Sequence, residues 1–135
     1  MIGARSTFPV TGGADWICAK EKHWLFDGTK MKNGDGIPGL VGWEWHGDPA
    51  DLPGLEVVAK GNVTSREATH AYTATIYPGP KDNFVFNCAT IWWSDGLSAP
   101  PGYLHPSAHG ASPKGPDPRV QRITGNLLNR FRSKG

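Results

Sequence analysis

Glycine and proline together place the strongest limit on what this sequence can fold into. Eighteen glycines and twelve prolines make up more than a fifth of its 135 residues. Glycine weakens helices and proline removes a backbone donor, so this content leaves little room for long helices. It stays below the level at which a disordered, low-complexity chain is the better interpretation. We therefore predict short strands joined by turns.

The chain length predicts one domain over residues 1–135, with a single modest core. Six tryptophans, five phenylalanines and three tyrosines supply bulky side chains for that core. We expect an irregular N-terminal region over residues 1–39, a β-rich core over 40–93, a loop over 94–116 and a helix over 117–132. The predicted class is α+β: a small, mainly β-sheet fold with a central hairpin, long Gly/Pro loops and one C-terminal amphipathic helix.

The charge balance argues against several classes of partner. The chain has fourteen lysines and arginines and twelve acidic residues. This net charge of +2 predicts no basic surface for nucleic acid or an anionic membrane. No stretch approaches the ~20 apolar residues of a membrane span, and residues 1–5 lack the pattern of a secretory signal. We expect a cytoplasmic chain in which Cys18 and Cys88 are buried thiols, with one disulfide between them as the alternative.

Segments rich in β-branched and aromatic residues predict the strands of the core. Residues 40–46 alternate in polarity, and 55–59 form a short strand that is followed by a polar loop over 62–70. Residues 71–77 and 84–93, joined by a turn rich in proline and glycine, predict a hairpin. Both faces of 84–93 are apolar, so we expect a central strand covered on both sides.

The chain ends in a predicted amphipathic helix over residues 117–132. Asp117 is a good N-cap, and Pro118 suits the first helical position. The apolar residues that follow at helical spacing are Val120, Ile123, Leu127, Leu128 and Phe131. We expect this stripe to face the core.

The strongest local cluster of chemical groups lies in residues 43–48, WEWHGD. On a strand Glu44 and His46 point the same way, and Asp48 follows a glycine that lets the backbone turn. A carboxylate, an imidazole and a second carboxylate suit a divalent metal ion, so Glu44, His46 and Asp48 are candidate metal ligands. Glu44 and His46 are also candidate catalytic residues, as a general base and its orienting partner. A solvated sheet face is the alternative interpretation.

Asp95 is the third candidate catalytic residue. It follows the predicted central strand in the run Ser94-Asp95-Gly96, and strand ends are common places for functional sites. His105 and His109 are four residues apart, a spacing that binds metal on a helix, but the surrounding prolines and glycines favour a surface loop.

Several segments, taken in order, resemble a known enzyme family. They are residues 23–29 (HWLFDGT), 36–44 (GIPGLVGWE), 74–77 (ATIY) and 84–97 (FVFNCATIWWSDGL), followed by the terminal helix. Together they resemble the C-terminal part of the large subunit of N,N-dimethylformamidase, over roughly residues 8–132.

This resemblance implies a portion of a larger α/β body related to the glutamine-amidotransferase-like fold. In it, residues 84–93 would be a late core strand and 117–132 the closing helix. The resemblance also implies amide hydrolysis assisted by an iron ion bound by tyrosines and a glutamate. A Gly-His-x-Glu-Tyr-Trp-like segment associated with that site is absent here, so we assign no iron ligand. Glu44 matches a characteristic Gly-x-Glu position.

Two function classes follow from the sequence. The first is a metal-assisted hydrolase acting on a small-molecule amide, ester or lactone, with iron implied by the resemblance and calcium or zinc as alternatives. The second is a non-catalytic module or subunit that completes a larger amidohydrolase. Missing strands would leave sheet edges and apolar surface exposed, so we expect a homo-oligomer or part of a larger assembly.

Overall fold

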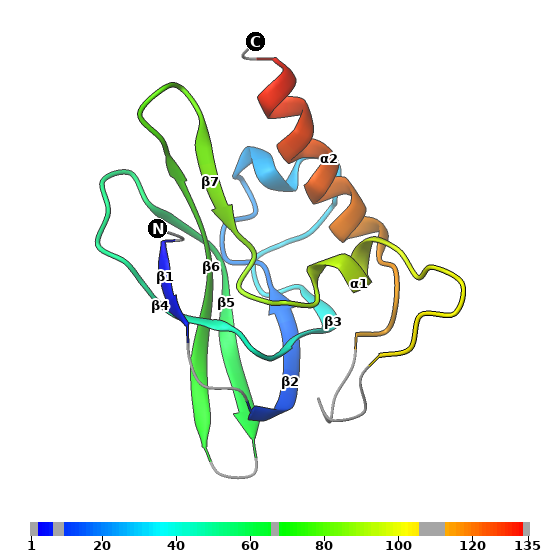
Figure 1. Ribbon diagram of the computed structural model, residues 1–135. Coiled ribbons are helices and arrows are strands. Elements are labelled where there is room, and N and C mark those ends of the chain that lie inside the picture. Colours follow the sequence, from blue (N-terminus) through cyan, green and yellow to red (C-terminus); the bar gives the residue numbers. More distant parts are fainter. Residues whose placement is uncertain (1–2, 7–9, 66–67, 106–112, 134–135) are drawn as a thin grey trace.

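The computed structural model describes residues 3–6, 10–65, 68–105 and 113–133 (Figure 1). Its body is an antiparallel five-stranded sheet with the strand order β3-β2-β5-β6-β7. The helices gather on one side of this sheet, and the two-stranded sheet of β1 and β4 lies on the other (Figure 1). Within the described ranges, no helix has both the length and the apolar character needed to cross a membrane.

The elements follow the chain with strands first and helices towards the end. The strands are β1 (Ala4–Ser6), β2 (Val10–Ile17), β3 (Gly36–Trp43), β4 (His46–Pro49), β5 (Glu56–Ser65), β6 (Thr69–Pro78) and β7 (Phe84–Asn87). The helices are the 3-10 helix η1 (Trp24–Phe26), α1 (Trp93–Leu97) and α2 (Pro118–Arg132). This arrangement confirms the predicted α+β class, mainly β-sheet with one long C-terminal helix. The single-domain organisation stays a prediction.

Two regions predicted to lack strands contain them. The N-terminal region over residues 1–39 was expected to be irregular, yet it holds β1, β2 and the start of β3. The expected loop over 62–70 is wrong as well, because β5 continues to Ser65 and pairs with β6 from Thr69. Polar residues on the exposed side of this hairpin alternate with the buried Val63. The exposed polar residues of one face therefore led to the wrong prediction of a loop.

The predicted hairpin of residues 71–77 and 84–93 is confirmed as β6 and β7. The prediction that its second strand is central and runs to residue 93 is wrong. β7 ends at Asn87 and forms an edge of the sheet. The chain turns away there because the Asn87 side chain accepts a hydrogen bond from the N–H of Ala89 (3.0 Å), which has a φ of +68°. The residues after the turn lead into α1.

The strand that is covered on both faces is β6. All five residues from 72 to 76 are buried. Tyr72 and Ala74 belong to the core cluster, while Thr73 hydrogen-bonds through its hydroxyl to the carbonyl of Gly47 in β4. The β1–β4 sheet therefore gives β6 a second buried face.

Tyr72 also fills a break in the ladder between β2 and β5. The two strands pair at Gly13 and meet again beyond the end of β2, at Cys18. Between these points the Tyr72 hydroxyl accepts a hydrogen bond from the N–H of Ile17 (2.8 Å) and donates one to the carbonyl of Asp15 (2.5 Å). A side chain from β6 thus satisfies backbone groups of β2, two strands away.

Gly61 of β5 makes this reach possible. It pairs with Tyr72 in the β5–β6 ladder, and a Cβ added to it would lie 2.8 Å from the Tyr72 ring. Burial raises the pKa of Tyr72 to about 12, so the hydroxyl keeps its proton at physiological pH.

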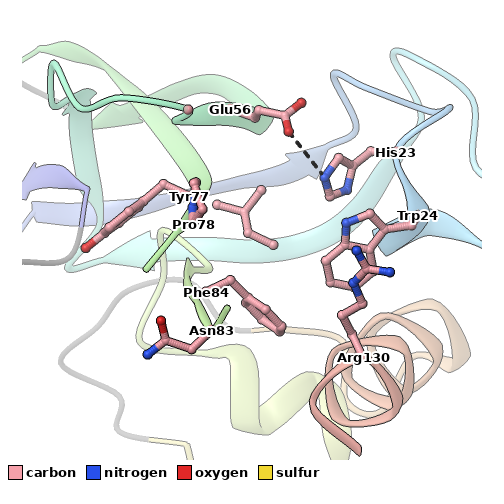
Figure 2. A pocket seen from close by; sticks show the side chains of 10 residues that line it. His23, Trp24, Glu56, Tyr77, Pro78, Asn83, Phe84 and Arg130 are labelled. Carbon is pink, nitrogen blue, oxygen red and sulfur yellow. Dashed lines mark ion pairs between the residues drawn. The ribbon is translucent and has the colours of Figure 1, made fainter. Parts of the chain in front are cut away.

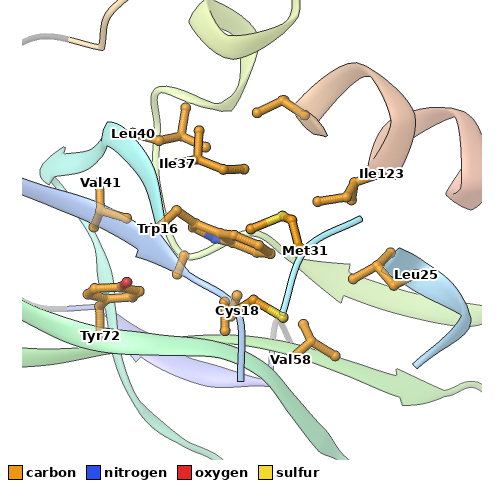
Figure 3. Packing of buried hydrophobic residues seen from close by; sticks show 14 of the residues in the cluster. Trp16, Cys18, Leu25, Met31, Ile37, Leu40, Val41, Val58, Tyr72 and Ile123 are labelled. Carbon is orange, nitrogen blue, oxygen red and sulfur yellow. The ribbon is translucent and has the colours of Figure 1, made fainter. Parts of the chain in front are cut away.

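Trp16 on β2 lies at the middle of the core (Figure 3). It is fully buried, and its ring packs against Phe26 and Trp93 with centroid distances of 6.0 and 5.4 Å. Its indole N–H donates to the carbonyl of Cys88 at 2.8 Å, which ties β2 to the segment after β7. Cys18 and Cys88 are free thiols; Cys18 is buried, as expected, whereas Cys88 is half-buried. Desolvation raises the pKa of both.

The C-terminal helix α2 matches its prediction closely. The Asp117 carboxylate accepts a hydrogen bond from the N–H of Arg119 (2.8 Å) and pairs with its guanidinium (2.7 Å). Val120, Ile123 and Leu127 are buried against the core.

The last part of the predicted apolar stripe does not face the core. Leu128 is 59% exposed and Phe131 is 50% exposed. These residues lie near the end of α2, which projects beyond the sheet (Figure 1). Phe131 stacks on Phe84 of β7 with a centroid distance of 4.2 Å.

Replacing Tyr72 with phenylalanine tests the bridge between β6 and β2. We expect Tyr72→Phe to lower the free energy of unfolding by about 2 kcal/mol, because it leaves the Ile17 N–H and the Asp15 carbonyl without their partner. Urea unfolding measures this loss. Tyr103→Phe removes a hydroxyl from a half-exposed ring and should change stability far less. Equal effects of the two changes would contradict the proposed bridge.

The N-cap of α2 predicts a pH-dependent contribution to stability. The Arg119 guanidinium holds the pKa of Asp117 below its ordinary value of 3.8. The ion pair therefore stabilises the fold above that ordinary value, and this contribution is lost as the pH falls through the folded pKa. Asp117→Asn keeps a capping side chain and removes the charge, so we expect a loss of about 0.5 kcal/mol at pH 7. In urea unfolding the difference from the wild type should shrink as the pH is lowered below 3.8; a difference that stays constant with pH would refute the assignment.

Candidate functional site

The structure interrupts the strand that was predicted to align Glu44 with His46. β3 ends at Trp43, whose φ of +50° turns the chain, and the next strand, β4, begins at His46. Glu44 lies between these strands and is exposed, as is Asp48, while His46 is half-buried. The alternation on which the shared face was predicted therefore breaks at Trp43.

His46 is hydrogen-bonded to the end of β7 and to the turn that follows it. Its Nδ1 forms a hydrogen bond with Oδ1 of Asn87, and its backbone N–H donates to the carbonyl of Ala89 at 3.1 Å. The amide oxygen of Asn87 can only accept, so Nδ1 of His46 carries the proton. His46 thus ties β4 to the turn that follows β7.

The candidate metal ligands do not form a cluster as they lie. Across the described ranges, no group of three or more His, Cys, Asp or Glu side chains is placed to hold a metal ion. Glu44 and Asp48 are exposed and His46 is engaged by Asn87. These three residues do not fit one ion in this arrangement, and their assignment as ligands stays a prediction.

Asp95 occupies a different place, on helix α1. It lines a small cavity of about 150 Å³ together with Ser94, Ser98, Pro100 and Tyr103, which we call the Asp95 cavity. A hydrogen bond to the Asp95 carboxylate raises the pKa of the Tyr103 hydroxyl, because ionised Tyr103 would lose this bond and face a like charge.

His105 lies beside Asp95. Its Nδ1 is 3.8 Å from a carboxylate oxygen of Asp95, and its ring meets Trp92 edge-on at 5.0 Å. His109, the other histidine of the pair in the sequence, lies outside the described residues. The structure therefore gathers an acid, an imidazole and a phenol at this point.

A second cavity, of about 260 Å³, lies where η1, the end of α2 and the β6–β7 hairpin meet (Figure 2). We call it the aromatic pocket, since Trp24, Tyr77 and Phe84 contribute their rings to its lining. It is lined by His23, Trp24, Gly54, Glu56, Ile76, Tyr77, Pro78, Asn83, Phe84 and Arg130.

Trp24 organises the wall of the aromatic pocket. It meets Phe84 edge-on, with ring centroids 5.5 Å apart. The Arg130 guanidinium lies 5.4 Å from the centroid of the Trp24 ring, within the range of a cation–π interaction. Two aromatic rings set at an angle to each other thus line this side of the pocket, with one positive charge beside them.

His23 and Glu56 form the polar side of the pocket. His23 caps η1, with Nδ1 accepting a hydrogen bond from the N–H of Leu25 (3.2 Å), so its ring proton belongs on Nε2. Nε2 lies 3.7 Å from a carboxylate oxygen of Glu56. Burial lowers the pKa of His23, although Glu56 acts in the opposite direction, so the ring is neutral at pH 7. A hydrogen bond from Lys20 lowers the pKa of Glu56.

Reasoning from the sequence did not find the aromatic pocket. Its residues come from four segments that lie about twenty or more residues apart, 23–24, 54–56, 76–84 and 130, and none forms a local motif of binding chemistry. His23 and Trp24 belong to the segment HWLFDGT on which the family resemblance was based. That segment was the available signal, and it gave no indication of a role in binding.

Comparison with known proteins confirms the family resemblance. A family model described as N,N-dimethylformamidase beta subunit-like, C-terminal, matches residues 1–109. No curated protein and no solved structure matches the chain. The match covers less of the chain than the expected 8–132, because it leaves out α2. The large-subunit assignment and the amidotransferase-like fold stay predictions.

Two alanine variants separate a structural His46 from a metal-binding one. We expect His46→Ala to lower the free energy of unfolding by about 1 kcal/mol, because Asn87 loses a partner, and Glu44→Ala to change it by less than about 0.5 kcal/mol. Urea unfolding and metal analysis of both purified variants provide the test. A similar loss of bound metal in both variants would instead support the metal-site prediction.

Proposed function

Because this chain belongs to the N,N-dimethylformamidase beta subunit-like C-terminal family, we propose that it works in an enzyme that hydrolyses amide bonds. The observation that carries the proposal is the Asp95 cavity, where a carboxylate meets hydroxyl groups. Esters and lactones have the same reactive carbonyl group, so they are included as substrates. The cavity volume of about 150 Å³ suits a small molecule.

Amide hydrolysis needs a base for the attacking water and hydrogen-bond donors for the carbonyl oxygen. In our proposal the Asp95 carboxylate is the base, and the hydroxyls of Ser94 and Ser98 are the donors. The water oxygen forms a bond to the carbonyl carbon while its proton passes to Asp95. Asp95 then gives that proton to the amide nitrogen as the carbon–nitrogen bond breaks, releasing an acid and an amine.

Tyr103 and His105 serve as positioning residues in this scheme. Tyr103 donates a hydrogen bond to Asp95, and His105 lies 3.8 Å from it, so both restrict where its carboxylate can turn. A metal ion, whether iron, zinc or calcium, would add polarisation of the carbonyl group. We derive no step through a metal, because Glu44, His46 and Asp48 do not fit one ion as they lie.

A second candidate function is a non-catalytic module that completes a larger amidohydrolase. Exposed apolar side chains favour it: Leu104 is 86% exposed, Leu128 59% and Phe131 50%. Phe131 and Leu128 lie near the end of α2, where a partner subunit or a second copy of the chain could cover them. The family description includes the words beta subunit-like, which supports a larger assembly.

Replacing Asp95 tests the catalytic proposal. We expect the purified chain to release amine from small N-alkylformamides, and Asp95→Asn to lower kcat at least ~100-fold, because it removes the base. The matched control is Asp51→Asn, which changes an exposed aspartate and should retain full activity. Amine release and urea unfolding are measured on each variant.

The same experiment distinguishes the two candidate functions. Activity that survives Asp95→Asn would overturn the assignment of Asp95 as base. An inactive wild-type chain that light scattering finds as a dimer or in a larger assembly would favour the non-catalytic module.

A further inference from the structure

We propose that the aromatic pocket binds a small planar carboxylate, a flat apolar ring that bears one negative charge. This inference concerns a cavity other than the Asp95 cavity and does not depend on amide hydrolysis. It is carried by the size of the pocket, its aromatic wall and the guanidinium of Arg130 (Figure 2).

The size of the pocket fits one ring with a small substituent. Its volume is about 260 Å³. An engineered apolar cavity of about 150 Å³ is enough to bind benzene. The remaining space accommodates a carboxylate group, while a larger drug-sized molecule would project into solvent.

The shape of the wall favours a planar ligand. Trp24 and Phe84 meet edge-on at 5.5 Å, and Ile76 and Pro78 add apolar surface from β6. Aromatic side chains prefer stacked or edge-to-face contacts, which a flat ring can make. The stack of Phe131 on Phe84 holds this part of the wall in place.

The charges around the pocket select an anion. In the described part of the chain, no ion pair joins Arg130 to a carboxylate, and its guanidinium rests on Trp24. Glu56 carries the opposite charge but forms a hydrogen-bonded ion pair with Lys20. His23 is neutral at pH 7 and directs its Nε2 proton towards Glu56. Arg130 is therefore the cation left to receive a ligand.

The geometry of arginine favours a carboxylate over other anions in this pocket. A guanidinium offers parallel N–H donors that match two carboxylate oxygens. The cation–π contact with Trp24 does not use the N–H donors of the guanidinium in hydrogen bonds, so these donors are available to a ligand. A single arginine beside apolar walls suits one charge on a flat body, whereas a zwitterion would also require a free acidic partner.

Titration of the ¹⁵N-labelled chain with benzoate, followed by NMR, tests this proposal. We expect saturable shifts at the Trp24 indole N–H and at the residues of η1. Benzyl alcohol has a similar shape without the charge and should bind at least ten-fold more weakly. Phenylalanine, which carries both charges, should also bind more weakly than 3-phenylpropionate.

Variants of the helix arginines provide the matched controls. Arg130→Gln should weaken benzoate binding at least ten-fold, and Arg130→Lys should restore part of it by returning the charge. Arg132→Gln changes another exposed arginine of α2 and should leave binding unaltered. Equal binding of benzyl alcohol and benzoate, unchanged binding in Arg130→Gln, or shifts that avoid Trp24 would each overturn the proposal.

Discussion

The hydrogen bonds of the Tyr72 hydroxyl support the part of β2 on which the core is built. This hydroxyl joins β6 to the backbone at Asp15 and Ile17, on either side of Trp16. Trp16 in turn packs against Trp93 and bonds to the carbonyl of Cys88. The position of α1, and with it the Asp95 cavity, depends on this chain of contacts. Removing the hydroxyl should therefore also weaken the packing of α1, beyond β2 itself.

The two cavities depend on different parts of the fold. The Asp95 cavity is formed by α1 and the segment that follows it. The aromatic pocket requires η1 to be held against α2, which Asn126 does by donating hydrogen bonds to the carbonyls of Leu25 (3.0 Å) and Asp27 (2.8 Å). A ligand in one cavity need not disturb the other, because no side chain lines both. Our two proposals can therefore be tested separately.

Local chemistry was the part of this structure that could be predicted from sequence. Asp117 and Pro118 marked the start of α2, since a cap needs only its nearest neighbours. The end of the strand at Trp43 could not be predicted, because a positive φ at a bulky residue is imposed by tertiary packing. The aromatic pocket was missed for a similar reason: Trp24 and Arg130 meet only after the chain has folded. The family resemblance succeeded because it used the order of several segments together.

The reach of Tyr72 across Gly61 has a consequence for the order in which the sheet assembles. The β5–β6 hairpin joins neighbouring segments, so it can form early with little loss of chain entropy. The amide of Ile17 gains its partner only from a side chain of that hairpin. We therefore expect the C-terminal half of β2 to dock after this hairpin has formed. Tyr72 lies in neither strand of the β2–β5 ladder, yet we expect it to influence how fast that ladder closes.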